Sequence, residues 1–302
     1  MYVASSLCVG RLRLKDRKVF AVQCLATREI QNLLLDILVE FDGVCQERGI
    51  RYSLEGGTLL GAARHKGFIP WDDDIDVTVP RPDFNRMCQH PEWFDGRFQL
   101  AVPGANGYVL PFAKLFDIEW RAKEPGMPEL FTEYLWVDIF PADALPEQEE
   151  DEVRLLKTLE GYYKRGGHAL VDSSEACEGG GASLKTVLKD RVARPLYRAL
   201  FPAETSYRLL SERAQALPYG STSRVGNIVW CYTALEGKPW PTICTDDFDR
   251  LVELDFEGRR FKAVEHWDEY LSANYGDYMQ LPPEDQRRTH GLEVWRAADT
   301  GA

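Results

Sequence analysis

Residues 50–79 contain two apolar segments separated by a Gly-Gly pair and a run of acids, and few folds accommodate this order. Apolar and polar residues alternate over 50–55, which predicts a strand, and Gly56-Gly57 breaks the alternation. A short helix, capped by Thr58, is expected next. A second strand is predicted at 74–79, where aliphatic residues take every second position. The segment therefore predicts a strand, a glycine turn, a helix and an acid-bearing strand in succession.

The acids of this second strand predict a metal site. Asp74 and Asp76 are two residues apart, so their side chains project from the same face. Unpaired carboxylates between apolar residues are costly, and hard divalent ions such as Mg²⁺ or Mn²⁺ relieve the repulsion by binding oxygen ligands. Asp138 is a third acid, embedded in the apolar segment 134–140. If the two strands are neighbours, all three carboxylates converge on one metal site. The other acids of the run are interpreted as solvated turn residues or as outer groups of the site: Asp72 and Asp73.

The glycine turn predicts a phosphate site beside the acids. Gly56 and Gly57 let backbone N–H groups approach a phosphate closely, and the N-terminus of the following helix favours negative charge. Thr58 adds a hydroxyl donor. Three basic residues are candidates to complete the phosphate site: Arg64, Lys66 and Lys114.

Composition excludes several classes of protein. The formal net charge of −12 argues against nucleic-acid binding, which relies on surplus Lys and Arg, but it allows a nucleotide substrate with a divalent cation. Seven scattered cysteines without a CxxC pair fit a reducing compartment. No apolar run reaches the roughly 20 residues of a transmembrane helix, and we expect no signal peptide. We therefore expect a cytoplasmic protein, with contact at the inner face of the membrane left open.

We predict an N-terminal extension (1–25) and a single catalytic domain (26–302) with a flexible, glycine-rich insert near 173–183. Apolar periodicity, proline and glycine positions predict the following helices: 27–49, 82–94, 147–165, 184–201, 204–217 and 266–275. Further strands are predicted at 100–102, 112–116 and 134–140.

The segment 52–84, YSLEGGTLLGAARHKGFIPWDDDIDVTVPRPDF, resembles the signature of the LicD family. That family includes bacterial phosphocholine transferases and is related to fukutin and the fukutin-related protein. The resemblance extends to the preceding helix, to WVDIFPAD at 136–143 and to the tail at 275–283 with Arg287 and His290, so it covers roughly 25–292. The middle of the chain, 145–235, is generic.

The resemblance implies an α/β (α+β) nucleotidyltransferase-type fold, a mixed sheet flanked by helices. By position it makes Gly56-Gly57 the donor-binding turn and Asp74, Asp76 and Asp138 the acids that hold Mg²⁺. The implied enzyme moves phosphocholine, or a similar phospho-alcohol such as ribitol phosphate, from a CDP-linked donor to a hydroxyl of a cell-surface glycan or its lipid-linked precursor. Arg287 and His290 match positions where the family has Arg and His, so they either bind donor phosphates or form a structural pair.

Several alternatives stay open at the level of sequence. A nucleotidyltransferase of the same fold would release pyrophosphate from an NTP, and a non-catalytic scaffold would use the fold only for binding. A glycosyltransferase with a DxD metal motif fits poorly, because the glycine turn comes so close before the acids. Asp138 is either a metal ligand or the general base. The alcohol, the acceptor and the oligomeric state are not determined.

Overall fold

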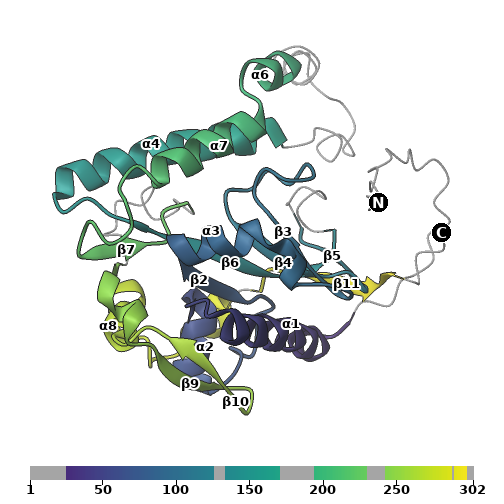
Figure 1. Ribbon diagram of the computed structural model, residues 1–302. Helices are drawn as coiled ribbons and strands as arrows, with labels where there is room; N and C mark the ends of the chain where they lie inside the picture. Colours follow the sequence, from purple (N-terminus) through teal and green to yellow (C-terminus); the bar gives the residue numbers. More distant parts are fainter. Residues whose placement is uncertain (1–24, 126–132, 171–193, 230–241, 288, 298–302) are drawn as a thin grey trace, which may run out of the picture.

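The computed structural model describes residues 25–125, 133–170, 194–229, 242–287 and 289–297 (Figure 1). The helices are α1 (Thr27–Arg48), α2 (Gly56–His65), α3 (Arg81–Gln89), α4 (Glu149–Leu170), α6 (Arg194–Leu200), α7 (Ala203–Ala214) and α8 (Trp267–Tyr275). The strands are β1 (Ser53–Leu54), β2 (Asp76–Pro80), β3 (Phe98–Ala101), β4 (Ala113–Asp117), β5 (Trp120–Lys123), β6 (Leu135–Ala144), β7 (Arg224–Gly226), β8 (Ile243–Cys244), β9 (Val252–Phe256), β10 (Arg259–Ala263) and β11 (Glu293–Arg296). Short 3₁₀ turns occupy Pro91–Trp93, Thr245–Asp249 and Glu284–Gln286.

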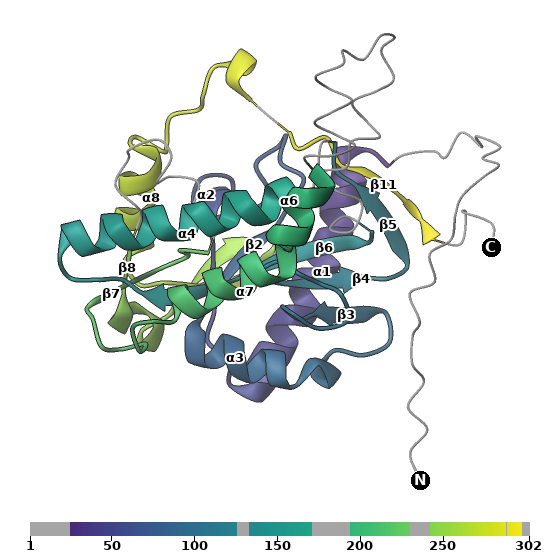
Figure 2. The ribbon, with the colours of Figure 1, turned by 90° about the horizontal axis from the view of Figure 1, so that it is seen from above.

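The main sheet is mixed. Its strand order is β1-β2-β6-β4-β3, and β6 continues into pairing with β7, which pairs with β8. β2 and β6 are parallel, whereas β1, β4 and β3 pair antiparallel with their neighbours. α1 packs against β4 and β6 on one side of the sheet, and α4 and α7 lie side by side on the other (Figures 1 and 2). The predicted α+β fold with helices flanking a mixed sheet is confirmed.

The core has two parts, one on each side of this sheet. The larger part includes Leu34, Ile37 and Phe41 of α1, packed with Val77 and Ile139 from the sheet. The smaller part joins α4 and α7 to aromatic residues of the sheet region, and its members include Phe112, Phe140, Leu159 and Leu210. Both faces of the central strands are therefore covered, which is why these strands read as nearly continuous apolar runs.

α1 has the predicted extent but a different N-cap. The helix runs over Thr27–Arg48, and Gly49 ends it in the left-handed conformation with φ 63°. Thr27 has a hydroxyl that could cap a helix, but it lies inside α1, and the N-cap is Ala26, whose N–H donates to Glu29 Oε2 at 2.8 Å. The carboxylate of Glu29, the third residue of the helix, thus accepts the hydrogen bond from the cap residue, and α1 begins without a capping hydroxyl.

The elements around the glycine turn also differ in detail from the prediction. α2 begins at Gly56 with Glu55 as its N-cap, so Thr58 lies inside the first turn and does not cap it. β1 is limited to Ser53–Leu54, and β2 begins at Asp76 after an irregular stretch that contains Asp74. The residues next to β1 and β2 are irregular, although apolar and polar side chains alternate through them. The alternation therefore predicts longer strands than the structure has.

The C-terminal segment returns to the centre of the molecule. β11 pairs antiparallel with β5, and α8 packs beside α2 (Figure 1). The β9–β10 hairpin packs against α2, where Glu257 N–H donates to Lys66 O at 2.9 Å. The β9–β10 hairpin and α8 therefore both pack against α2, the helix that begins at the glycine turn.

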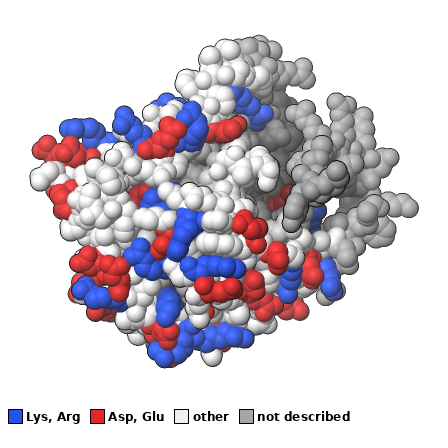
Figure 3. Space-filling model, viewed as in Figure 1, with Lys and Arg blue, Asp and Glu red and all other residues white. Residues whose placement is uncertain are grey.

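None of the described helices is both long and apolar enough to cross a membrane. On the face seen in Figure 3, acidic and basic side chains are interspersed. The predicted extension up to residue 24, the insert at 173–183 and the start of the predicted helix 184–201 lie outside the described residues. So do four cysteines, whereas Cys45, Cys88 and Cys244 are described and free.

Candidate active site

The sheet brings the predicted acids together. In the parallel pair of β2 and β6, Asp76 is the register partner of Asp138. In the antiparallel pair of β4 and β6, Lys114 is the partner of the same Asp138. The N–H of Asp138 donates to Ile75 O at 3.0 Å, which extends the pairing past the end of β2 towards Asp74. The two acid-bearing strands are neighbours, which is the condition for their acids to converge, and Lys114 joins them from a third strand.

Lys114 contacts Asp138 from a buried position. Its Nζ lies 3.0 Å from Asp138 Oδ1, and the side chain of Lys114 is 4% exposed. The ammonium also lies 3.8 Å from the centroid of the Trp136 ring, and Trp136 Nε1 donates to Asp138 Oδ2 at 2.9 Å. Burial lowers the pKa of Lys114, although the charge of Asp138 opposes that shift. Lys114 therefore offsets the charge of Asp138, whether or not it also reaches a phosphate.

Asp74 and Asp76 lie in a concentration of acidic side chains that includes Asp72 and Asp138. Burial and the charge of Asp72 raise the pKa of Asp74 to about 8. Burial, and then the charges of Asp74 and Asp138, raise the pKa of Asp76 well above its usual range. Asp138 Oδ1 is buried and accepts no hydrogen bond from the described residues, although the ammonium of Lys114 is close. Neighbouring carboxylate oxygens fit a hard divalent cation. Such a cation would reduce the repulsion between the carboxylates and would give Asp138 Oδ1 a partner.

The predicted trio is not the tightest acidic group of the described chain. Ligand atoms within 4.8 Å of one another occur in two groups there, one being Asp247, Glu265 and His266 and the other Asp72, Asp73 and His290. The predicted trio of Asp74, Asp76 and Asp138 is not among them, so its carboxylates share a region but are more widely spaced.

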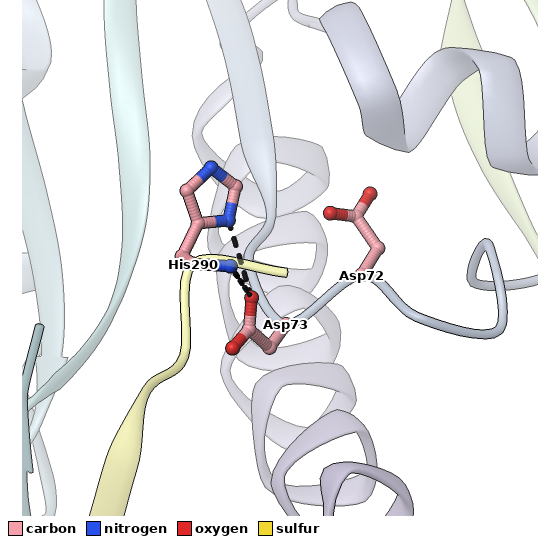
Figure 4. A group of neighbouring side chains, drawn as sticks. All are labelled: Asp72, Asp73 and His290. Carbon is pink, nitrogen blue, oxygen red and sulfur yellow. Dashed lines mark hydrogen bonds and ion pairs between the residues drawn. The ribbon is translucent and has the colours of Figure 1, made fainter. Parts of the chain in front are cut away.

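Asp73 anchors the C-terminal segment (Figure 4). It accepts hydrogen bonds from Thr289 Oγ1 at 2.8 Å, Leu292 N at 2.8 Å and His290 N at 2.9 Å, and His290 Nδ1 lies 3.1 Å from Oδ1. Burial alone would raise the pKa of Asp73, but these hydrogen bonds lower it to about 2. Asp73 is 2% exposed, so the interpretation as a solvated turn acid is wrong for this residue.

His290 meets the acids through this anchor. The hydrogen bond with Asp73, and then the charge of Asp74, raise the pKa of His290 to about 9, so the imidazole is a cation at neutral pH. Its Nδ1 lies 3.5 Å from Asp74 Oδ2. The structure therefore places His290 beside the predicted metal acids and in a structural pair with Asp73.

The glycine turn is bonded directly to the acid strand. Glu55 N donates to Asp76 O at 3.0 Å, and Asp76 N donates to Thr58 Oγ1 at 2.9 Å. Gly56 has φ 51°, and a Cβ there would lie 3.6 Å from Asp76 Oδ2. A Cβ on Gly57 would lie 2.9 Å from Asp72 Oδ2, closer than side chains tolerate. Carboxylates and backbone amides therefore approach each other closely at this turn, and Thr58 joins the turn to the strand from a buried position.

Glu55 is buried at the start of α2. The hydroxyl of Tyr270, from α8, donates a hydrogen bond to Glu55 Oε1. Burial raises the pKa of Glu55 to about 7, although the hydrogen bond from Tyr270 opposes the shift. α8 is thereby fixed to the residue that precedes the glycine turn.

The other predicted basic residues are held by different contacts. Arg64 and Lys66 are at the opposite end of α2, about 12–15 Å along the helix at 1.5 Å per residue. Arg64 Nη1 donates to Tyr278 O at 2.7 Å, and Lys66 ends the helix with φ 59° and an exposed side chain. Arg287 lies over the Trp71 ring, with Cζ 4.8 Å from its centroid. The structure therefore brings Lys114 and His290 to the acids, whereas Arg64 and Arg287 have partners in the C-terminal segment and in Trp71.

Two comparisons with known proteins decide the family. The family model for LicD/FKTN/FKRP, nucleotidyltransferase domain, matches residues 49–151. The lipopolysaccharide cholinephosphotransferase LicD of Haemophilus influenzae is 31% identical over 277 residues, which cover 89% of this chain and 97% of that protein. This chain belongs to the LicD family.

Other relatives match shorter segments of the chain. Ribitol 5-phosphate transferase FKRP of mouse and of human is 60% identical over 47 residues, which cover 16% of this chain and 10% of each protein. An uncharacterized protein of Rickettsia prowazekii is 40% identical over 85 residues, or 28% of this chain and 29% of that protein.

The sequence did not reveal two features of the site. Nothing in the sequence distinguishes the buried Asp73 from its exposed-looking neighbours, because its partners are more than 200 residues away. The pairing of Glu55 with Tyr270 is equally distant. Asp143, by contrast, was visible as a second acid in the apolar segment 136–143, and it forms a buried pair with Arg81.

Proposed function

We propose that this protein is a metal-dependent transferase that moves phosphocholine, or a similar phospho-alcohol, from a CDP-linked donor to a hydroxyl of a cell-surface glycan or its precursor. The observation that carries the proposal is the 31% identity with lipopolysaccharide cholinephosphotransferase LicD over nearly the whole of both chains. The activities named for this relative and for ribitol 5-phosphate transferase FKRP share the transfer of an alcohol joined to phosphate.

The geometry supports transfer chemistry at the glycine turn. Phosphoryl-type transfer depends on positioning and on neutralising charge, and it requires little covalent participation by the protein. Gly56 and Gly57, at the N-terminus of α2, offer backbone amides to an anionic donor, and the acids lie immediately beside them. His290 is a cation at the same edge and would attract the donor phosphates.

Asp74, Asp76 and Asp138 are the residues that would hold the metal ion. Mg²⁺ would supply neutralisation of the pyrophosphate and of the leaving CMP. Lys114 lies 3.0 Å from Asp138 Oδ1 and would hold this carboxylate in place beside the other two acids. A base role for Asp138 would require its oxygen to reach the acceptor hydroxyl, directly or through one water.

The test is a nucleotide-release assay with purified protein and Mg²⁺, in which CDP-choline, CDP-ribitol, CDP-glycerol and CTP are offered separately, each with and without EDTA. We expect EDTA-sensitive release of CMP from one CDP-alcohol and no pyrophosphate from CTP. Pyrophosphate release from CTP would replace this proposal with a nucleotidyltransferase. Absence of any release, with glycan acceptors added, would leave a binding scaffold as the better account.

A pair of variants ties the activity to the site. Asp76→Asn removes a predicted metal ligand, whereas Asp36→Asn changes an acid of α1 whose side chain is 58% exposed. Only the first substitution should abolish CMP release. Equal activity in both variants, with unchanged metal dependence, would show that the acids of β2 are not the metal site.

A further inference from the structure

α8 presents two tyrosines to the glycine turn, and they differ in their surroundings. Tyr270 is 7% exposed, and its hydroxyl donates to Glu55. Tyr275, the last residue of α8, is 43% exposed. One tyrosine therefore connects α8 to the base of the turn, and the other is open to solvent.

The hydroxyl of Tyr275 lies at the glycine turn itself. It is 3.8 Å from the point where Gly56 would carry a Cβ, and Asp76 Oδ2 is 3.6 Å from the same point. Within the described residues it makes no hydrogen bond, in contrast to the hydroxyls of Tyr52, Tyr270 and Tyr278. A hydroxyl that makes no hydrogen bond within the described residues thus lies beside Gly56.

The backbone on both sides of Tyr275 is fixed. Gly276 ends α8 with φ 68° and ψ −129°, a conformation that side chains disfavour, and its N–H donates to Ser272 O at 2.9 Å. Two residues later, Tyr278 O accepts a hydrogen bond from Arg64 at 2.7 Å. The backbone that carries Tyr275 is therefore held in place by the fold.

We propose that Tyr275 is a donor-binding residue whose hydroxyl donates a hydrogen bond to a phosphate oxygen of the donor at the glycine turn. The proposal rests on the proposed function, because it assumes a phosphate-bearing donor there. The neighbouring side chains on the α2 side are carboxylates, which cannot donate to a phosphate once they are ionised, whereas a phenol keeps its proton at neutral pH. Tyr275 complements the backbone amides of Gly56 and Gly57 from the opposite side.

Tyr275→Phe tests this role because it removes only the hydroxyl. We expect Mg²⁺-dependent binding of inorganic pyrophosphate, measured by calorimetry, to weaken about tenfold or more, as for a lost hydrogen bond to a charged group. KM for the CDP-alcohol should rise by a similar factor, with Tm unchanged because the hydroxyl has no partner in the described residues. Tyr278→Phe is the matched control, since its hydroxyl donates to Asp268, and we expect wild-type pyrophosphate affinity.

The two readouts separate this inference from the proposed function. Wild-type pyrophosphate affinity in Tyr275→Phe would overturn the inference, even if CMP release from a CDP-alcohol confirmed the transferase. Weaker pyrophosphate binding in Tyr275→Phe supports the inference, even if none of the CDP-alcohols is a donor. Failure of the wild-type protein to bind pyrophosphate with Mg²⁺ would also overturn it, because the turn would then not be a phosphate site.

Discussion

Asp76 and Asp138 are register partners on two parallel strands, and their carboxylates lie on the same face of the sheet. Each is flanked along its strand by buried aliphatic residues: Ile75, Val77, Val137 and Ile139. A pair of acids in such surroundings is unfavourable for stability unless a cation is present. The pairing therefore indicates a function that requires the charge, and the predictions below separate that function from the stability of the fold.

Asp76→Asn should remain folded and lose transfer by about a thousandfold or more, because a metal ligand that acts on the transition state is removed. Mg²⁺ should raise the Tm of the wild-type protein and leave the Tm of the variant unchanged. Without metal, the variant should be at least as stable as wild type, since one source of repulsion is gone. Thermal unfolding with Mg²⁺ and with EDTA checks both statements, and an equal Mg²⁺ shift in the two proteins would contradict them.

Lys114→Met should destabilise the protein by about 3 kcal/mol, because it leaves Asp138 as a buried charge without its cation. Asp138→Asn in the same chain should recover most of that loss, so the two changes are not additive. Urea denaturation of the two single variants and of the double variant measures the coupling. Additive effects would show that the ion pair contributes little to the free energy of unfolding.

Gly57→Ala should reduce activity strongly, because its Cβ would lie 2.9 Å from Asp72 Oδ2 and displace that carboxylate or the turn. Gly43→Ala is the matched control: Gly43 is exposed within α1, and nothing lies within 4 Å of its Cβ position. The control should gain about 0.5–1 kcal/mol of stability from helix propensity. CMP release and urea denaturation compare the two, and an active Gly57→Ala protein would show that the turn tolerates a side chain.

Glu55 should make the metal-free protein less stable as the pH rises. Its pKa is about 7 in the folded chain, above the ordinary 4.5, so the folded state retains a proton that the unfolded state releases between these values. Stability is therefore highest below pH 4.5 for this group and falls as the pH rises through 7, by about 3 kcal/mol at most.

Glu55→Gln should reduce this pH dependence, as measured by urea denaturation at pH 5 and pH 8 in EDTA. Some slope should remain, because Asp74 has a raised pKa of about 8 and acts with the same sign. Glu47→Gln, which changes an exposed residue near the end of α1, should keep the wild-type slope. An unchanged slope in Glu55→Gln would contradict the assignment of the raised pKa to this residue.

Asp143→Asn should destabilise the fold by about 3–5 kcal/mol without changing the metal dependence of transfer. Asp143 accepts two hydrogen bonds from Arg81, at 2.6 Å and 2.5 Å, and both side chains are almost fully buried. The pair connects the start of α3 to β6, beyond the metal acids along the strand. Kinetics below the unfolding transition, together with urea denaturation, distinguish this structural role from a role in the site.

Local patterns were sufficient to predict the main helices and strands and to select candidate acids for a site. The apolar stripe of 27–49 indicates α1 because packing one helix face against a sheet requires that period. Asp74 and Asp76 could be chosen as candidate site residues because acids between aliphatic residues are unusual in any strand, central or at the edge of a sheet. The family could be recognised for the same reason, since the glycine turn and the acids are contiguous in the chain.

Partners distant in the chain could be assigned only from the tertiary structure. The three aspartates at 72–74 look alike in sequence, yet Asp73 is buried under the C-terminal segment because Thr289, His290 and Leu292 donate to it. Tyr275 reaches the glycine turn because α8 packs beside α2. Sequence determined which residues carry charge and which segments form strands and helices, because both depend on local chemistry. The fold decided which of those charges are paired, buried or open to a ligand, because such contacts join residues that no local pattern connects.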